Sequence, residues 1–223
     1  MSSINIASAY SLEEIEKNAH LHKATSLIAL IQFAIESYDN FIQFVRMRLD
    51  SAVVKMQQNA NIINFNLTED QLTLYLISYI EIPLVGLEAH HEVNERGHCD
   101  ITIKLYNYTW HGEAKKHKTS YSYLFKGYSQ LTERYSYCDN NSKAGGVIIY
   151  LSRPNTSLVM NKWQTHLDTY APKVLKQKSF SSSFCRSNPN VLLSEHTHTV
   201  SGLKYCVTHY PVNFYYNPKD RDM

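Results

Sequence analysis

The apolar run Val147–Leu151 constrains the fold more strongly than any other segment of the chain. It follows a polar, glycine-containing loop at 140–146, it has the length of a strand, and Pro154 ends the pattern. A continuous apolar run of this kind is typical of a strand that is buried on both faces, whereas a half-exposed strand alternates apolar and polar residues. Such a strand needs a covering layer on each side, so we expect it near the centre of an α/β sheet.

Helical and strand patterns alternate on both sides of this run. The expected strands are rich in β-branched and aromatic residues, and the expected helices carry apolar residues at spacings of three and four. Strands are expected at 87–93, 100–106 and 108–115, helices at 68–82, 119–137 and 160–170, and a hairpin of strands 191–200 and 203–216 that turns at Ser201-Gly202. A polar, serine-rich loop is expected at 173–190. This order predicts a mixed central sheet flanked by helices, with a C-terminal β-hairpin.

Gly127 stands inside the helix expected at 119–137. A glycine in a helix interior costs about 1 kcal/mol relative to alanine. We therefore expect a close approach at this position, either to the sheet or to a ligand.

The N-terminal part of the chain has the pattern of a helical extension. The segment 24–58 contains no proline or glycine, and its apolar residues recur at helical spacing. One long helix or two stacked helices are expected there, within an N-terminal helical extension at 1–60 that precedes a main domain at 61–223. The most apolar stretch, 27–35, is closed by Glu36 and is too short to span a bilayer.

The composition indicates a globular protein, since 43% of the residues are hydrophobic, and a length of 223 residues allows one domain with a sizeable core or a domain plus an extension. A formal net charge of +2 does not indicate a strongly basic nucleic-acid binder, so any phosphate-binding surface has to be local. The run 115–118, with Lys126 and Arg134, supplies such a basic patch. Four scattered cysteines favour a reducing compartment, and no signal peptide opens the chain. A cytoplasmic protein is expected.

Acidic residues and a lysine are placed at the ends of two neighbouring expected strands. Asp100 opens the second strand, and Glu113-Ala114-Lys115 closes the third. Strand side chains alternate, so Glu113 and Lys115 point to the same face. Two carboxylates at neighbouring strand ends can share a divalent cation, and with a lysine beside them they are the minimum equipment for metal-assisted cleavage of a phosphodiester. The ordinary alternative is a strand edge with solvated charges, because short motifs occur often by chance.

Over residues 68–151 the order of elements and these motif residues resemble the PD-(D/E)XK nuclease superfamily, which has the restriction-endonuclease-like fold. The resemblance implies that Asp100, Glu113 and the backbone carbonyl of Ala114 bind Mg²⁺, for which Mn²⁺ can substitute. It also implies that Lys115 orients the attacking water or pairs with the scissile phosphate.

Two further residues match the family by their place. Glu69, in the first turn of the helix before the first strand, resembles a glutamate that binds metal directly or through water. Gln130, on the helix after the third strand, resembles a glutamine that holds a nucleotide or the attacking water. The chain departs from the family pattern at two positions. Cys99 stands where a proline is usual, and the tyrosine expected four residues after Gln130 is Tyr135, one residue later.

The resemblance implies a metal-dependent nuclease that hydrolyses the phosphodiester bonds of nucleic acid, with DNA favoured as the substrate. By analogy alone, such a protein would be an effector of a prokaryotic antiviral defence or restriction system. No membrane partner is expected, and a homodimer or a partner protein would associate through the N-terminal helices.

The residues leave other interpretations open. A non-catalytic module would bind nucleic acid or assemble with a protein through the N-terminal helices and the 17 tyrosines. His196, His198 and His209 in the hairpin could bind zinc or form a polar strand face. Glu69 could serve only as a favourable charge at a helix N-terminus, and Gln130 could face solvent.

Overall fold

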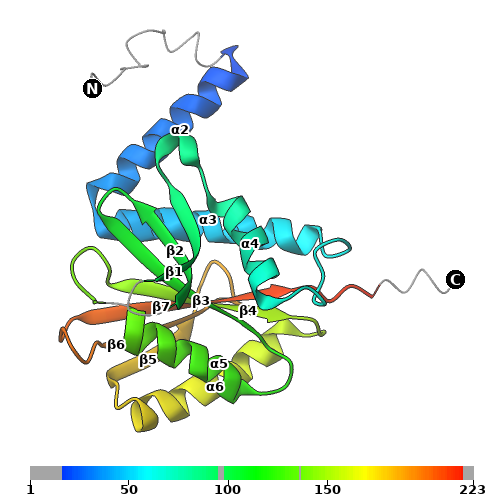
Figure 1. The fold of residues 1–223 in the computed structure, drawn as a ribbon, viewed down its shortest axis with the longest axis vertical. Coiled ribbons are helices and arrows are strands. Elements are labelled where there is room, and N and C mark those ends of the chain that lie inside the picture. The colour runs from blue at the N-terminus through cyan, green and yellow to red at the C-terminus, as the bar shows by residue number, and fades with distance from the viewer. Residues whose placement is uncertain (1–16, 95–97, 136, 218–223) are drawn as a thin grey trace, which may run out of the picture.

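The computed structural model describes residues 17–94, 98–135 and 137–217. Its centre is a seven-stranded mixed sheet in the order β1-β2-β3-β4-β7-β6-β5, with helices on both faces (Figure 1). This arrangement confirms the expected α/β class and the mixed sheet flanked by helices. The strands are β1 (Glu88–Asn94), β2 (His98–Leu105), β3 (Tyr108–Lys116), β4 (Ala144–Leu151), β5 (Lys178–Phe184), β6 (Leu192–Thr197) and β7 (Lys204–Asn213). The helices are α2 (Ala19–Glu36), α3 (Tyr38–Gln58), α4 (Glu69–Ile80), α5 (Tyr121–Gln130) and α6 (Thr156–Val174), with a 3-10 turn η2 (Pro83–Val85) and a π-helical turn η3 (Leu131–Tyr135).

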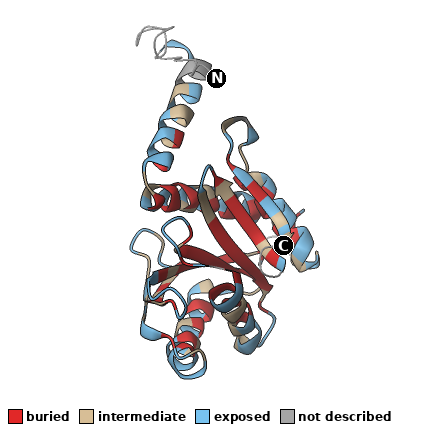
Figure 2. Ribbon diagram, turned by 60° about the vertical axis from the view of Figure 1, so that its left-hand side comes forward, coloured by how far each residue is buried: buried red, intermediate tan, exposed pale blue. Residues whose placement is uncertain are grey.

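The strand β4 lies between β3 and β7 and is parallel to both. All of its residues are buried, which confirms the strand expected from the apolar run. Ile148 and Tyr150 belong to the core layer that α3 and α4 share with the sheet. Val147, Ile149 and Leu151 belong to the layer formed with α5 and α6. The run is apolar at every position because helices cover the sheet on both sides (Figure 2).

The N-terminal region forms two helices, α2 and α3, which is one of the two expected alternatives. Between them the hydroxyl of Ser37 accepts a hydrogen bond from the backbone N–H of Asn40 and caps α3. Tyr38 then joins α3 to the sheet, because its hydroxyl donates to the carbonyl of Thr109 and accepts from the N–H of Ala144. The helix α2 packs against α3 and extends away from the sheet (Figure 1). Within the described ranges, none of the helices combines the length and the apolar character that a membrane crossing requires.

The C-terminal hairpin is confirmed as β6 and β7, and it belongs to the central sheet. β7 pairs with β6 in antiparallel fashion and with β4 in parallel fashion, so the hairpin continues the sheet beyond β4. The loop expected at 173–190 is wrong, because α6 continues to Val174 and β5 forms the sheet edge over Lys178–Phe184. Most of β5 is serine, so the segment lacks the alternating apolar pattern that identifies a strand, and pairing with β6 holds it instead.

His209 lies in the core with both ring nitrogens engaged. The indole N–H of Trp163 donates to Nδ1 at 3.2 Å, and Nε2 lies 2.9 Å from the hydroxyl of Ser194. Because an indole nitrogen is only a donor, Nδ1 has to be unprotonated, and the Nε2–H group donates to Ser194. Burial lowers the pKa of His209 to about 3, and burial together with the neighbouring His198 lowers the pKa of His196 to about 4. Both rings are therefore neutral in the native protein at pH 7.

We expect these two histidines to make the fold sensitive to acid. In the unfolded chain each has a pKa of about 6.5, so below that pH only the unfolded state takes up protons, and the free energy of unfolding falls as the pH is lowered. The loss should be about 1.4 kcal/mol per pH unit for each histidine. Urea unfolding between about pH 7.5 and 5 measures it. His209→Gln should flatten the profile relative to the exposed control His98→Gln, and equal slopes in the two variants would contradict the assignment.

Candidate active site

The ladder between β2 and β3 ends just before the candidate acids. Ile101 opposite Gly112 is its last pair, so the next positions, Asp100 and Glu113, lie opposite one another on one face of the sheet. From this point β3 stays paired with β4 alone. The N–H of Ala114 donates to Asp100 Oδ2 at 2.9 Å. The side chain of Asp100 thus takes the place of a strand partner where the two strands separate.

The ammonium of Lys115 lies at the centre of an acidic cluster. Its Nζ atom is 2.6 Å from Glu113 Oε1, 3.2 Å from Asp100 Oδ2 and 3.1 Å from the carbonyl oxygen of Ala114. A fourth oxygen, Glu69 Oε1, is 3.9 Å away. The structure therefore brings together all of the candidate metal-ligating residues and Lys115.

Glu69 reaches the cluster from the start of α4. This helix begins with a capping box, in which Thr68 and Gln71 exchange side-chain and backbone hydrogen bonds. Glu69 Oε2 accepts the backbone N–H of Lys116 at 2.6 Å, and the hydroxyl of Tyr123 donates to Glu69 Oε1 at 3.0 Å. Glu69 is held by the end of β3 and by α5, so its position involves more than a favourable charge at a helix N-terminus.

Glu113 is the most buried carboxylate of the cluster, with 1% of its side chain exposed, against 24% for Asp100 and for Glu69. Its Oε2 atom is buried and has no hydrogen-bond partner within the described part of the chain. Burial raises the pKa of Glu113 to about 7; the charge of Asp100 adds to the rise, and the Lys115 ammonium opposes it. Burial alone would lower the pKa of Lys115, but the surrounding carboxylates raise it above its usual value. The cluster holds more negative charge than one ammonium offsets.

The donor set fits a hard divalent cation. When all three are ionised, Glu69, Asp100 and Glu113 carry three negative charges against the single positive charge of Lys115, and the buried Oε2 of Glu113 has no hydrogen-bond partner among the described residues. Carboxylate and carbonyl oxygens are the ligands that Mg²⁺ and Mn²⁺ prefer. The residues therefore suit the metal that the sequence resemblance implies.

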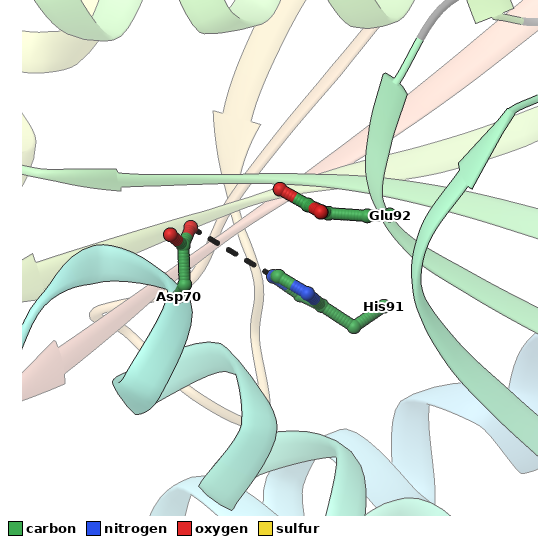
Figure 3. Close-up of side chains that lie close together, drawn as sticks. All are labelled: Asp70, His91 and Glu92. Atoms are coloured by element: carbon green, nitrogen blue, oxygen red, sulfur yellow. Dashed lines mark ion pairs between the residues drawn. The ribbon is translucent and has the colours of Figure 1, made fainter.

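A second group of metal-ligating side chains consists of Asp70, His91 and Glu92. One ligand atom from each lies within 4.8 Å of the others, and His91 Nε2 is 3.8 Å from Asp70 Oδ1 (Figure 3). Among the described residues no other three His, Cys, Asp or Glu side chains lie this close together, so the carboxylate oxygens of Glu69, Asp100 and Glu113 are spaced more widely around the Lys115 ammonium. Asp70 and Glu92 are exposed, so water solvates their charges. No sequence pattern indicates this group, because α4 and β1 supply its members separately.

The helix expected at 119–137 divides into α5 and the π-helical turn η3. Gln130 ends α5, is half-buried, and forms no hydrogen bond to the acidic cluster within the described ranges. Tyr135 is buried, and burial followed by the nearby charges of Glu113 and Asp100 raises its pKa to about 12. Tyr135 ends the π-helical turn η3, five residues after Gln130. The charges of the acids act on the hydroxyl of Tyr135, whereas the amide of Gln130 makes no hydrogen bond to them within the described residues.

Lys116 and Tyr123 belong to the site although no sequence pattern assigns them there. The ammonium of Lys116, expected in the basic patch, donates to the carbonyls of Phe65 and Leu67 at 2.6 and 2.8 Å. It thereby fixes the loop before α4, while its backbone N–H holds Glu69. Tyr123 and Lys116 also line a cavity of about 450 Å³ beside Glu69. These contacts join segments about fifty residues apart, which local patterns do not reveal.

The three C-terminal histidines do not meet. His196 and His209 lie towards opposite ends of the β6–β7 ladder, where His209 is paired with Leu192. His198 accepts the backbone N–H of Ser201 in the turn beyond β6. Within the described residues these histidines form no group of metal ligands, so the zinc site that the sequence allowed is wrong. The spacing places His196 and His198 on one face, but the hairpin register separates His209 from them along the strand.

Comparisons of the chain with protein-family models, with curated proteins and with solved structures give no match. The functional assignment therefore depends on the chemistry of the acidic cluster itself.

Gly127 allows α5 to approach this cluster, which confirms the close approach expected at this glycine and shows that the sheet is what it meets. A Cβ atom at position 127 would lie 2.8 Å from Lys115 Cγ and 3.1 Å from Glu113 Cγ. Real Cβ atoms rarely come so close to a neighbour, so a side chain at this position would displace both residues.

Gly127→Ala should destabilise the protein although alanine is the better helix former. Helix propensity favours alanine by about 1 kcal/mol, whereas forcing a methyl group against Lys115 and Glu113 should cost about 1–3 kcal/mol. Thermal unfolding measures the net change. Ser122→Ala, at an exposed position of the same helix, is the matched control. A Tm for Gly127→Ala that equals or exceeds the wild-type value would contradict the tight contact.

Proposed function

We propose that this protein is a metal-dependent nuclease that hydrolyses phosphodiester bonds of nucleic acid with Mg²⁺ as its cofactor. The observation that carries the proposal is the convergence of Glu69, Asp100 and Glu113 on the ammonium of Lys115. Acids from two neighbouring strands and from the preceding helix are also features of the PD-(D/E)XK superfamily. We place the chain there as a divergent member with the restriction-endonuclease-like fold.

In the proposed mechanism the acidic residues bind the metal, and Lys115 acts on the substrate or on the attacking water. Asp100, Glu113 and the carbonyl of Ala114 would hold the cation, and Glu69 would complete the set from α4. When bound there, Mg²⁺ would lower the pKa of a water molecule and stabilise the charge that grows on the phosphoryl group, and Mn²⁺ could substitute for it. Lys115 pairs with the scissile phosphate or orients the attacking water.

Nucleic acid is the substrate class that the surroundings of the cluster favour. The cavity beside Glu69 is also lined by Lys118, Thr119, Ser120 and Tyr123. A lysine, two hydroxyl groups and an exposed aromatic ring suit phosphate groups and a stacked base. DNA remains the favoured substrate by analogy with the superfamily.

Association with a second copy or a partner protein would use α2. This helix extends away from the sheet (Figure 2). The exposed fractions of its residues Phe33 and Ile35 are 36% and 37%. A non-catalytic binding module would use the same helix, and substitutions in the acidic cluster separate the two functions.

Glu113→Gln and Asp100→Asn should each reduce Mg²⁺-dependent cleavage about a thousandfold, because each removes a charged ligand from the cation. Labelled single-stranded and duplex DNA and RNA, incubated with Mg²⁺ or with EDTA, measure the rate. Glu195→Gln is the control, since this exposed carboxylate of β6 pairs with Lys204 of β7, on the other side of β4 from the cluster, and should leave the rate unchanged. Wild-type protein that cleaves none of these substrates, or full activity in Glu113→Gln, would remove the nuclease assignment and leave the binding module.

Metal binding and cleavage should both weaken below about pH 7. The pKa of Glu113 is raised to about 7, so below that pH the carboxyl is protonated and a cation has to displace the proton, whereas above it the carboxylate is already charged. Affinity should then fall about tenfold per pH unit on the acid side. Calorimetric titration with Mn²⁺ at pH 6, 7 and 8 measures the trend. An affinity that stays constant over this range would show that Glu113 is not a ligand.

A further inference from the structure

The ammonium of Lys115 contacts the oxygens that the proposed function assigns to the metal. A lysine ammonium has three donors. Here they meet Glu113 Oε1, Asp100 Oδ2 and the carbonyl oxygen of Ala114, at 2.6, 3.2 and 3.1 Å. The hydrogen-bonding capacity of the amine is therefore fully used inside the site.

A divalent cation and this ammonium cannot occupy the same position. Mg²⁺ binds oxygen at about 2.0–2.1 Å, so a cation held by these three oxygens would lie in the space that Nζ fills. Two positive centres so close together would also repel one another strongly in a partly buried site. Metal binding through these three oxygens therefore requires Nζ to move.

We propose that the ammonium of Lys115 competes with the metal for its binding position. The ammonium occupies this position until a divalent cation displaces it. The displaced amine can then contact the scissile phosphate. This inference rests on the proposed function, because it concerns the same oxygens. Lys115 then has two effects of opposite sign. It stabilises the acidic cluster when metal is scarce, and it weakens the affinity of the cluster for metal.

The packing around Lys115 indicates where the amine goes. Its Cγ atom lies close to α5, since a Cβ atom built on Gly127 would be 2.8 Å from it. Its Nζ atom lies 3.9 Å from Glu69 Oε1 and 6.0 Å from the ring centre of Tyr123, and both residues border the cavity of about 450 Å³. Rotation about the outer bonds of the side chain carries Nζ towards this cavity while the inner carbons stay in place. Metal loading and phosphate contact are thereby coupled.

Removal of the positive charge of Lys115 tests whether its ammonium competes with a metal. Methionine is unbranched like lysine but has no charge. Lys115→Met leaves the three carboxylates of Glu69, Asp100 and Glu113 facing one another without a cation, which should lower stability in EDTA. A divalent cation would then bind without having to displace an amine.

The experiment compares wild type, Lys115→Met and Lys118→Met by calorimetric titration with Mn²⁺ and by thermal unfolding in EDTA and in Mn²⁺. Lys118 is exposed on the rim of the same cavity, so its substitution removes a positive charge without emptying the cation position. We expect Lys115→Met to bind Mn²⁺ about tenfold more tightly than wild type, and Lys118→Met to stay within about twofold. In EDTA the Tm of Lys115→Met should lie below the wild-type value, and Mn²⁺ should raise it by more than it raises the wild-type Tm.

A second measurement follows the amine directly. In protein labelled with ¹⁵N-lysine, the Lys115 ammonium signal, identified by its loss in Lys115→Met, should be protected from exchange in EDTA. Saturating Mg²⁺ should shift the signal and speed its exchange with water. A signal unchanged by Mg²⁺ concentrations that saturate the site would overturn the inference.

The outcomes separate this inference from the proposed function. If wild type binds Mn²⁺ through Glu113 but Lys115→Met binds it no more tightly, the competition is refuted and the nuclease proposal stands. If Lys115→Met binds Mn²⁺ more tightly but wild type cleaves no nucleic acid, the competition stands and the nuclease proposal is refuted. If neither protein binds a divalent cation, both are refuted.

Discussion

The parallel pairing of β3 with β4 is the constraint on which the acidic cluster depends. β4 is buried between two helical layers, and it holds β3 along one side as far as Lys116. The other side of β3 loses its partner after Gly112, where β2 leaves the ladder. The end of β3 is thus hydrogen-bonded to a neighbouring strand on one side and unpaired on the other. The open side exposes the N–H of Ala114 to Asp100 and lets Glu113 and Lys115 face the same space.

Two buried polar side chains, His209 and Glu113, differ in their hydrogen bonding, and for this reason we assign a structural role to His209 and a function to Glu113. His209 has a partner for each ring nitrogen, so its burial leaves no hydrogen-bonding capacity unused. Glu113 is equally inaccessible, yet its Oε2 atom has no partner among the residues that the structure describes, and its carboxyl group shares the Lys115 ammonium with other acids. Buried polar groups in native proteins are nearly always satisfied. A carboxylate that the fold leaves unsatisfied beside two others is the kind of exception that functional sites retain at the expense of stability.

Local patterns anticipated those parts of the site that depend on a single element. Strand alternation put Glu113 and Lys115 on one face, and the cost of Gly127 in a helix indicated the close approach of α5. Local sequence patterns did not predict elements whose structure depends on contacts with other parts of the chain. The serine-rich β5 is a strand because β6 pairs with it, and α5 is followed by a π-helical turn, η3, that no residue type signals. The hairpin register likewise decided that His209 lies apart from His196.

The sequence by itself determined the central buried strand, the α/β class and the pairing of an acid with a lysine at the end of β3, because these follow from periodicity within a few residues. Only the tertiary structure decided that Glu69 joins Asp100 and Glu113. Its carboxylate is held by the N–H of Lys116, 47 residues further along the chain, and by the hydroxyl of Tyr123 in a different helix. It also decided that Lys115 stands among the carboxylates and not at a solvated edge, because strand separation, helix packing and charge all act there together. The acidic cluster therefore exists only in the folded protein, since α4, β2 and β3 each supply only part of it.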